Sequence, residues 1–160
     1  MEHHIAAYVQ KILGYVNDEP LTILASTPRV LQDVVRNLSE DQLKRRPAEL
    51  QWSVAEILAH LADSELAASF RVRKIISEPG SNIAAYDQLA WCSALDYAQQ
   101  PTADSLRVFT AVREANVRLY ERLTPEQWNA YGIHSERGEE SVKQLLTLLA
   151  GHDRNHISQI

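Results

Sequence analysis

Apolar side chains recur at intervals of three and four along most of this chain, which is the spacing of an amphipathic helix. The pattern predicts helices over residues 4–16, 28–38 (or from 21), 54–77, 84–98, 103–123 and 139–160. No segment shows the run of alternating apolar and polar positions that is typical of a strand. The pattern therefore predicts an all-α protein, with residues 131–138 forming a polar loop.

Local signals mark the start of the long central helix. Ser53 and Glu56 have the spacing of a capping box, in which each side chain bonds the other residue's backbone N–H. Trp52 and Ile57 flank them at the positions where a hydrophobic staple packs. We therefore predict that this helix begins at Val54.

Threonine and proline indicate other helix starts. Thr27 followed by Pro28 combines a good N-cap residue with the residue favoured at the first helical position, so a helix should begin at Pro28. Thr102 is expected to cap the helix that follows it. Residues 39–42 and 124–127 have capping-box spacing and predict two short helices.

The connection between the two longest internal helices covers residues 78–101, and Pro79-Gly80 stops the helix before it. In a helical bundle, a connection of this length is a crossover rather than a tight hairpin. The two helices that it joins therefore need not be antiparallel. We expect a bundle with a long crossover and short accessory helices, the first of them within residues 1–20.

Composition limits the class of protein. The chain has 160 residues, of which 45% are apolar and 23% are charged, so we expect one domain over residues 1–160 with a sizeable core. The net charge of −5 and the absence of a basic run longer than Lys44-Arg45-Arg46 argue against nucleic-acid binding. A single cysteine, Cys92, cannot form an internal disulfide, which favours a reducing cytosol. Without a signal peptide or an apolar run of roughly 20 residues, no membrane association is expected and the protein should be cytoplasmic.

Two histidines interrupt the apolar stripe of the last predicted helix. Positions 142, 145, 149, 152, 156 and 160 carry Val, Leu, Leu, His, His and Ile. His152 and His156 therefore stand where core leucines would be expected, with Cβ atoms about 6 Å apart on one face. Of the six histidines in the chain, His60 is the one on another long helix near its core-facing edge, with small residues around it.

Three histidines without a thiolate or an obvious fourth ligand are typical of a catalytic zinc site, which keeps one position open for water or substrate. Imidazole also suits nickel, iron and copper, so the ligands do not name the divalent ion. Asp63, three residues after His60, and Asn155, next to His156, are the nearest polar candidates for orienting a ring or holding a water. Periodicity alone leaves another interpretation open, in which the histidines are hydrogen-bonded core or surface residues.

The segments WSVAEILAHLADSE at residues 52–65 and GHDRNHISQI at residues 151–160 resemble the DinB-like superfamily of metal-binding four-helix bundles. The resemblance covers most of the chain. It implies up-down-down-up connectivity, a divalent ion on His60, His152 and His156, and frequently a homodimer. Members are thiol S-transferases similar to bacillithiol transferase, thiol-dependent isomerases, or proteins named only as metal-dependent hydrolases. The resemblance thus implies a metal cofactor, and for some members a thiol co-substrate, and leaves the reaction open.

Two hypotheses about function follow. In the first, the chain is a transferase or hydrolase acting on a small molecule, and the ion activates a low-molecular-weight thiol or a water. Arg71 or Arg73 would then meet a substrate carboxylate, and the loop with His134 and Glu136 would close over the site. Solvated surface charge and an ordinary polar loop are the favoured interpretations of these four residues. In the second hypothesis, the protein is a non-enzymatic metal-binding stress protein that acts through dimerisation or partner contact.

Overall fold

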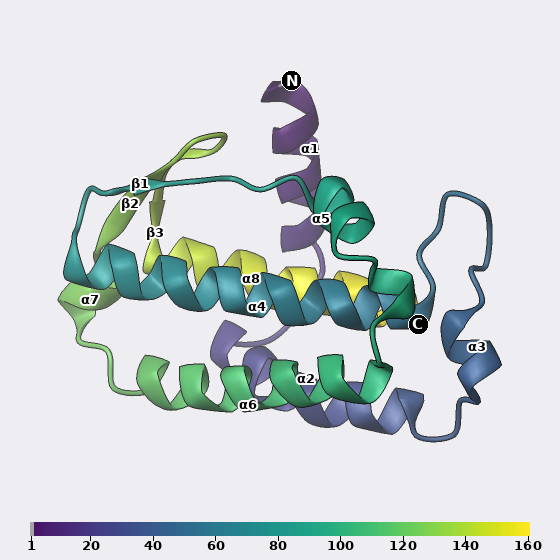
Figure 1. Cartoon of the computed structure of the whole chain (residues 1–160). Helices are drawn as coiled ribbons and strands as arrows, with labels where there is room; N and C mark the ends of the chain where they lie inside the picture. Colours follow the sequence, from purple (N-terminus) through teal and green to yellow (C-terminus); the bar gives the residue numbers. More distant parts are fainter. Residues whose placement is uncertain (1) are drawn as a thin grey trace.

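Four long helices form the body of the molecule (Figure 1). The computed structural model describes residues 2–160, with side chains from Ile5 onward. The four helices are α2 (Pro20–Val35), α4 (Val54–Ser77), α6 (Thr102–Tyr120) and α8 (Val142–Ile157). Helix α6 packs against α4 and α2, and α8 packs against α2 and α4, which closes a four-helix bundle.

Helices α4 and α6 run in the same direction because the chain crosses the length of the bundle between them, as the teal segment of Figure 1 shows. Residues 78–101 lead from the end of α4 back to the start of α6. Helices α2 and α8 run in the opposite direction. The predicted up-down-down-up connectivity and the long crossover are therefore confirmed.

The crossover is less helical than predicted. In place of one helix over residues 84–98, it holds strand β1 (Asn82–Ile83), helix α5 (Gln88–Ala94) and the single 3-10 turn η1 (Tyr97–Gln99). The side chain of Asp87 caps the start of α5, and Asp96 adopts a φ of 48°. A left-handed residue cannot continue an α-helix, so these two aspartates limit α5 at both ends.

A small three-stranded sheet contains the segment predicted as a polar loop at residues 131–138. Strand β2 (Tyr131–His134) pairs antiparallel with β3 (Gly138–Ser141) and parallel with β1. Successive residues of β2 alternate between exposed and buried, as a strand requires, but the two buried positions hold Gly132 and His134. Because neither residue is apolar, the alternation is invisible in the sequence. The all-α prediction is right for the bulk of the chain, and this sheet is the exception.

Capping boxes begin three helices as predicted. Ser53 accepts a hydrogen bond from the backbone N–H of Glu56, whose carboxylate accepts one from the backbone N–H of Ser53. Helix α4 accordingly begins at the expected residue. The same arrangement begins the short helices α3 (Glu40–Lys44) and α7 (Pro125–Asn129).

Of the two predicted starts for this helix, the one at Pro28 is wrong, because this proline lies inside α2. Helix α2 begins at Pro20, one residue before the alternative start at residue 21. The Thr27 hydroxyl donates to a backbone carbonyl one turn earlier, instead of capping a helix. Since proline has no N–H, the Leu24 carbonyl, four residues before Pro28, lacks its helical donor. The side chain of Arg113 donates to that carbonyl at 3.1 Å. A group from another helix thus replaces the bond that the proline removes.

The starts of α6 and α8 also differ from prediction. Thr102 is the first residue of α6, and the N-cap position belongs to Pro101, which makes no capping bond. Helix α8 begins at Val142 rather than at residue 139. The reason is that Ser141 forms a capping box with Gln144 while the residues before it belong to β3.

The accessory helix α1 (Glu2–Leu13) packs against α8 (Figure 1). It ends three residues earlier than predicted. A Cβ atom at Gly151 of α8 would overlap the backbone carbonyl of Ile12, so the glycine permits this close approach. Helix α1 is thereby placed beside the part of α8 that carries the histidines.

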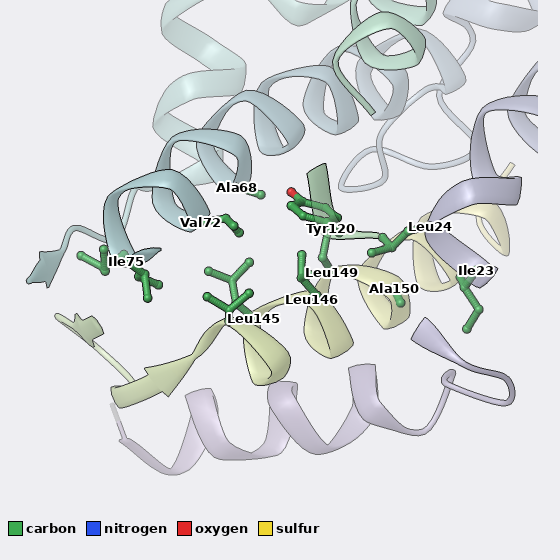
Figure 2. Packing of buried hydrophobic residues seen from close by; sticks show 12 residues of the cluster. Ile23, Leu24, Ala68, Val72, Ile75, Tyr120, Leu145, Leu146, Leu149 and Ala150 are labelled. Carbon is green, nitrogen blue, oxygen red and sulfur yellow. The ribbon is translucent and has the colours of Figure 1, made fainter. Parts of the chain in front are cut away.

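Two apolar clusters fill the bundle. Figure 2 shows the larger one, in which Val72 of α4, Leu146 of α8, Leu24 of α2 and Tyr120 of α6 pack together. The second cluster, around Leu58 of α4 and neighbouring residues of α2 and α6, lies toward the other end. Over residues 2–160, no helix combines the length and the hydropathy needed to cross a lipid bilayer.

Candidate metal centre

Three histidines from two helices converge beside the apolar core. His60 comes from α4, whereas His152 and His156 lie one turn apart on α8. The Nε2 atoms of His60 and His152 are 3.0 Å apart. One ring nitrogen from each of the three residues lies within 4.8 Å of those from the other two, which is close enough to hold one ion. The sequence-predicted grouping of these residues is therefore present in the fold.

The three imidazoles are neutral at physiological pH. Burial, followed by the neighbouring His156, lowers the pKa of His60 to about 3. Burial is also the main reason why the pKa of His152 lies well below its usual value, and it lowers the pKa of His156 against an opposing contribution from a hydrogen bond with Gln159. A neutral imidazole keeps one lone pair on a ring nitrogen. Three such donors fit a borderline divalent ion such as zinc or nickel.

Gln159 orients one of the three rings. The Nδ1 atom of His156 lies 3.0 Å from the side-chain oxygen of Gln159. An amide oxygen only accepts, so Nδ1 donates and the lone pair of His156 is on Nε2. Sequence reasoning missed Gln159, although its position three residues after His156 is a signal that could have found it.

The two predicted orienting residues have other surroundings. Asp63 accepts a hydrogen bond from the Tyr97 hydroxyl at 2.6 Å. The side-chain oxygen of Asn155 is buried and has no hydrogen-bond partner within the described part of the chain. Within the described part of the chain, neither side chain is hydrogen-bonded to the three histidines.

Aromatic and hydroxyl side chains surround the histidines. The ring of Trp52 lies 4.9 Å from that of His60 and is stacked at 6.2 Å on that of His156, measured between centroids. The Ser64 hydroxyl lies 3.4 Å from Nε2 of His60 and 2.8 Å from the Tyr86 hydroxyl. Trp52 covers the rings of His60 and His156, and the hydroxyl pair supplies hydrogen-bond donors next to His60.

Two cavities reach the histidines. The larger, of about 640 Å³, is lined by His152 together with Ser64 and Tyr86. The second, of about 500 Å³, is lined by His156 and Trp52. A small molecule could therefore approach the cluster from two sides.

Of the four residues whose roles the sequence leaves open, Arg71, His134 and Glu136 line the larger cavity. His134 is buried, and its Nδ1 accepts a hydrogen bond from the backbone N–H of Glu136. Arg73 contacts another region, because its guanidinium donates to Ser69 of α4 and to Asn116 of α6. Arg71 and Arg73 therefore have different surroundings, although the sequence pattern suggested the same possible role for both.

A buried charge network adjoins the histidines. The guanidinium of Arg113, fully buried, donates to both carboxylate oxygens of Asp153 and to Glu65 at 2.8 Å. Asn116 donates to the other oxygen of Glu65 at 2.6 Å. Asp153 directly follows His152, so the network anchors the segment of α8 that carries the cluster. Sequence reasoning missed this network.

Comparisons with known proteins support a common fold. Residues 23–160 match the family model described as the DinB superfamily. "Putative metal-dependent hydrolase OB0782" of Oceanobacillus iheyensis is 27% identical over 150 residues, which cover 94% of this chain and 87% of the relative. "Putative metal-dependent hydrolase YfiT" of Bacillus subtilis is 25% identical over 144 residues, covering 89% and 81%. The solved structure of YfiT, described as an "unusual four-helix bundle topology", aligns with a TM-score of 0.83 at 24% identity and covers 89% of this chain and 82% of that one.

Proposed function

Because this chain belongs to the DinB superfamily, we propose that it is a metal-dependent enzyme of the hydrolase or thiol-transferase type. The proposed ligands of its divalent ion are His60, His152 and His156. The observation that carries the proposal is the convergence of three neutral imidazoles beside two cavities. Metal-dependent hydrolysis, the activity in the names of the relatives, is consistent with this arrangement.

Three protein ligands would leave a position for a reactant, as in catalytic zinc sites. When bound, the ion would supply Lewis acidity, which lowers the pKa of a water or a thiol and polarises a carbonyl or related group. Zinc and nickel are the ions that we favour for an all-imidazole ligand set, and iron and copper also suit it.

The chain's own residues would bind and orient the reactants. The hydroxyls of Ser64 and Tyr86 lie close to His60 and line the larger cavity, so they can donate hydrogen bonds to a substrate oxygen. The Nδ1–H of His156 bonded to Gln159 keeps that ring turned with its Nε2 lone pair free. The indole of Trp52 packs on His60 and His156 and would limit the contact of these two rings with bulk water.

The cavities favour an enzyme over the alternative, a metal-binding stress protein without catalytic activity. Structural metal sites are usually closed by four protein ligands and need no space for a reactant. Here cavities of about 640 and 500 Å³ adjoin His152 and His156. The thiol co-substrate, the homodimer and the cytoplasmic location stay predictions.

The ligand assignment is tested by metal content. His152→Ala should lower the metal bound per chain to well below that of the wild type, because a two-histidine site binds far more weakly. His134→Ala, which removes a buried histidine from the same cavity wall, is the matched control and should retain the wild-type stoichiometry. Elemental analysis after zinc or nickel loading measures both. Equal metal content in wild type and His152→Ala would refute the ligand assignment.

The reaction class is tested with a panel of activated esters, amides and alkyl halides, each with and without low-molecular-weight thiols. Metal-dependent turnover in water alone would support a hydrolase, and turnover that needs a thiol would support a transferase. Loss of the activity on chelation and its return on reloading are expected in either case. A coordinatively saturated ion that exchanges neither water nor thiol would contradict the proposal.

A further inference from the structure

Arg71 is a half-buried cation without an anionic partner in the wall of the larger cavity. It lies on α4, and one terminal nitrogen of its guanidinium donates to the backbone carbonyl of Ala84 at 2.6 Å. The guanidinium also lies over the ring of Tyr86, 5.3 Å from its centroid. Among residues 5–160, no carboxylate lies within ion-pair distance of it, although Glu140 and Glu136 are near enough to oppose the effect of burial on its pKa. Burial lowers the pKa of Arg71, which reflects the cost of holding this charge away from water.

The other charged groups of the same cavity are already engaged or solvated. Arg137 forms a two-bond pair with Glu140, with both distances 2.7 Å. The carboxylate of Asp87 accepts from backbone N–H groups at the start of α5. Glu136 is exposed to solvent. Arg71 is therefore the charged group of this cavity with free donors for a ligand.

Most of the remaining wall is apolar. Val9 and Ile12 of α1, Ala68 of α4, and Leu145 and Leu149 of α8 line the cavity. An occupant must therefore combine an apolar body with an anionic end. A carboxylate suits the guanidinium best, since its two oxygens match two parallel N–H donors.

The spacing along α4 sets the length of such an occupant. Arg71 follows Ser64 by seven residues, which is two helical turns on the same face and about 10 Å along the axis. Ser64 touches His60 at the histidine cluster. An extended chain advances about 1.1–1.2 Å per bond, so a body of about nine bonds, or a shorter chain that includes a ring, would separate the anionic end of the ligand from its reacting group.

We propose that the larger cavity takes an amphiphilic carboxylate, with its carboxylate on the guanidinium of Arg71 and its apolar body against α1 and α8. The inference rests on the proposed function in that the cavity would be the substrate pocket. It adds the class of substrate, which is an acid with its reactive group remote from the carboxylate.

Binding of 4-phenylbutyrate and of its neutral amide, 4-phenylbutyramide, tests the inference. Calorimetric titration of the metal-loaded full chain should give the carboxylate a Kd roughly tenfold or more below that of the amide, because a charge-assisted hydrogen bond is lost in the amide. Arg71→Gln should abolish this preference, and Arg71→Lys should retain part of it through its point charge. Arg73→Gln is the matched control, since Arg73 lies on the same helix but contacts Ser69 and Asn116. It should keep the full preference.

A second titration, after chelation, separates this inference from the proposed function. Persistence of the preference in metal-free protein, together with its loss in Arg71→Gln, supports the inference even if metal-dependent activity is never found. A preference that disappears on chelation and survives Arg71→Gln would place the carboxylate on the ion, which overturns the inference and leaves the proposed function intact. Equal binding of the two probes by wild type, or binding of neither, also overturns it. Far-UV circular dichroism confirms that each variant is folded.

Discussion

Two clusters of buried polar side chains lie between α4 and α8, and they differ in what completes them. In the network around Arg113, the protein supplies the partners: both terminal nitrogens of the guanidinium are bonded to Asp153 or Glu65, and only Nε lacks an acceptor. In the histidine cluster, the Nδ1 atoms of His60 and His152 have no partner among the side chains described from Ile5 onward, and their Nε2 atoms face each other at 3.0 Å.

The two clusters also differ in whether they line a cavity. Neither of the two cavities is lined by Arg113, Glu65 or Asp153, whereas His152 and His156 each line one. A buried polar group is costly unless a partner compensates it. The first cluster finds its partners within the chain, so we interpret it as structural. The histidine cluster is accessible through the two cavities, so it is suited to a partner that is not part of the chain, such as a metal ion.

Arg113 links all four helices of the bundle. It comes from α6 and bonds the Leu24 carbonyl of α2, Glu65 of α4 and Asp153 of α8. The neighbour of Asp153 in the chain is His152, so the network holds α8 where its histidines meet His60. The structural cluster thus preorganises the proposed metal ligands.

The largest effect is expected from Arg113→Met, which leaves two buried carboxylates and the Leu24 carbonyl without their donor. Removing one partner of a buried ion pair typically costs about 3–5 kcal/mol of the free energy of unfolding. Urea denaturation of the metal-free protein measures it. Arg107→Met removes an exposed ion pair from the same helix and should change stability by less than about 0.5 kcal/mol. Similar losses in the two variants would show that the network does not stabilise the bundle.

Binding of a divalent ion to the histidine cluster should stabilise the folded protein. At free zinc a hundredfold above its Kd, the free energy of unfolding of wild type should rise by about 2.7 kcal/mol. His152→Ala should lose this gain. Magnesium, a hard cation that prefers oxygen ligands, is the control and should stabilise neither protein. Thermal or urea unfolding with each ion and with chelator supplies the measurement; a gain retained by His152→Ala would point to another zinc site.

Acid should destabilise the metal-free histidine cluster. The pKa of His60 is about 3 in the folded chain and near 6.5 when unfolded, so the unfolded chain binds the extra proton as the pH falls. The stability contributed by neutral His60 is present above pH 6.5 and is lost progressively between pH 6.5 and pH 3. Between pH 6 and pH 5, metal-free wild type should lose about 1 kcal/mol more than His60→Gln. Parallel pH profiles of the two proteins would contradict this prediction.

The effect at Gln159 should fall on metal affinity and not on folding, because this side chain is hydrogen-bonded to the ring of His156. Gln159→Ala should weaken zinc or nickel binding by about tenfold, as is usual when a partner that orients a metal-binding histidine is removed. Gln159→Glu keeps an oxygen acceptor for the Nδ1–H of His156 and should retain wild-type affinity or exceed it. Competition with a chromophoric chelator measures both. Equal weakening in the two variants would mean that the hydrogen bond is not the cause.

Much of the fold follows from signals within one or two turns of helix. The capping box of Ser53 and Glu56 depends on residues three apart and correctly predicts the start of α4. The stripe that places His152 and His156 on one face is equally local, because helical periodicity alone defines it. His60 could be selected as their partner because it too lies on the core-facing side of a long, well-delimited helix.

Other features depend on which segments meet in space. Pro28 is a good helix start by local rules and yet lies inside α2, where Arg113 from α6 replaces the missing backbone donor. Strand β2 is hidden in the sequence because packing against other elements, and not apolarity, buries Gly132 and His134.

The sequence by itself determined the helical class, the bounds of α4 and the three histidines that converge, because each depends on short-range periodicity or capping. Only the tertiary structure decided that Arg71 lines the cavity of His152 while Arg73 bonds Asn116. The two arginines stand two positions apart on one helix and therefore point in different directions. The crossover and α6 determine what each arginine contacts. No local sequence pattern predicts where these two segments lie.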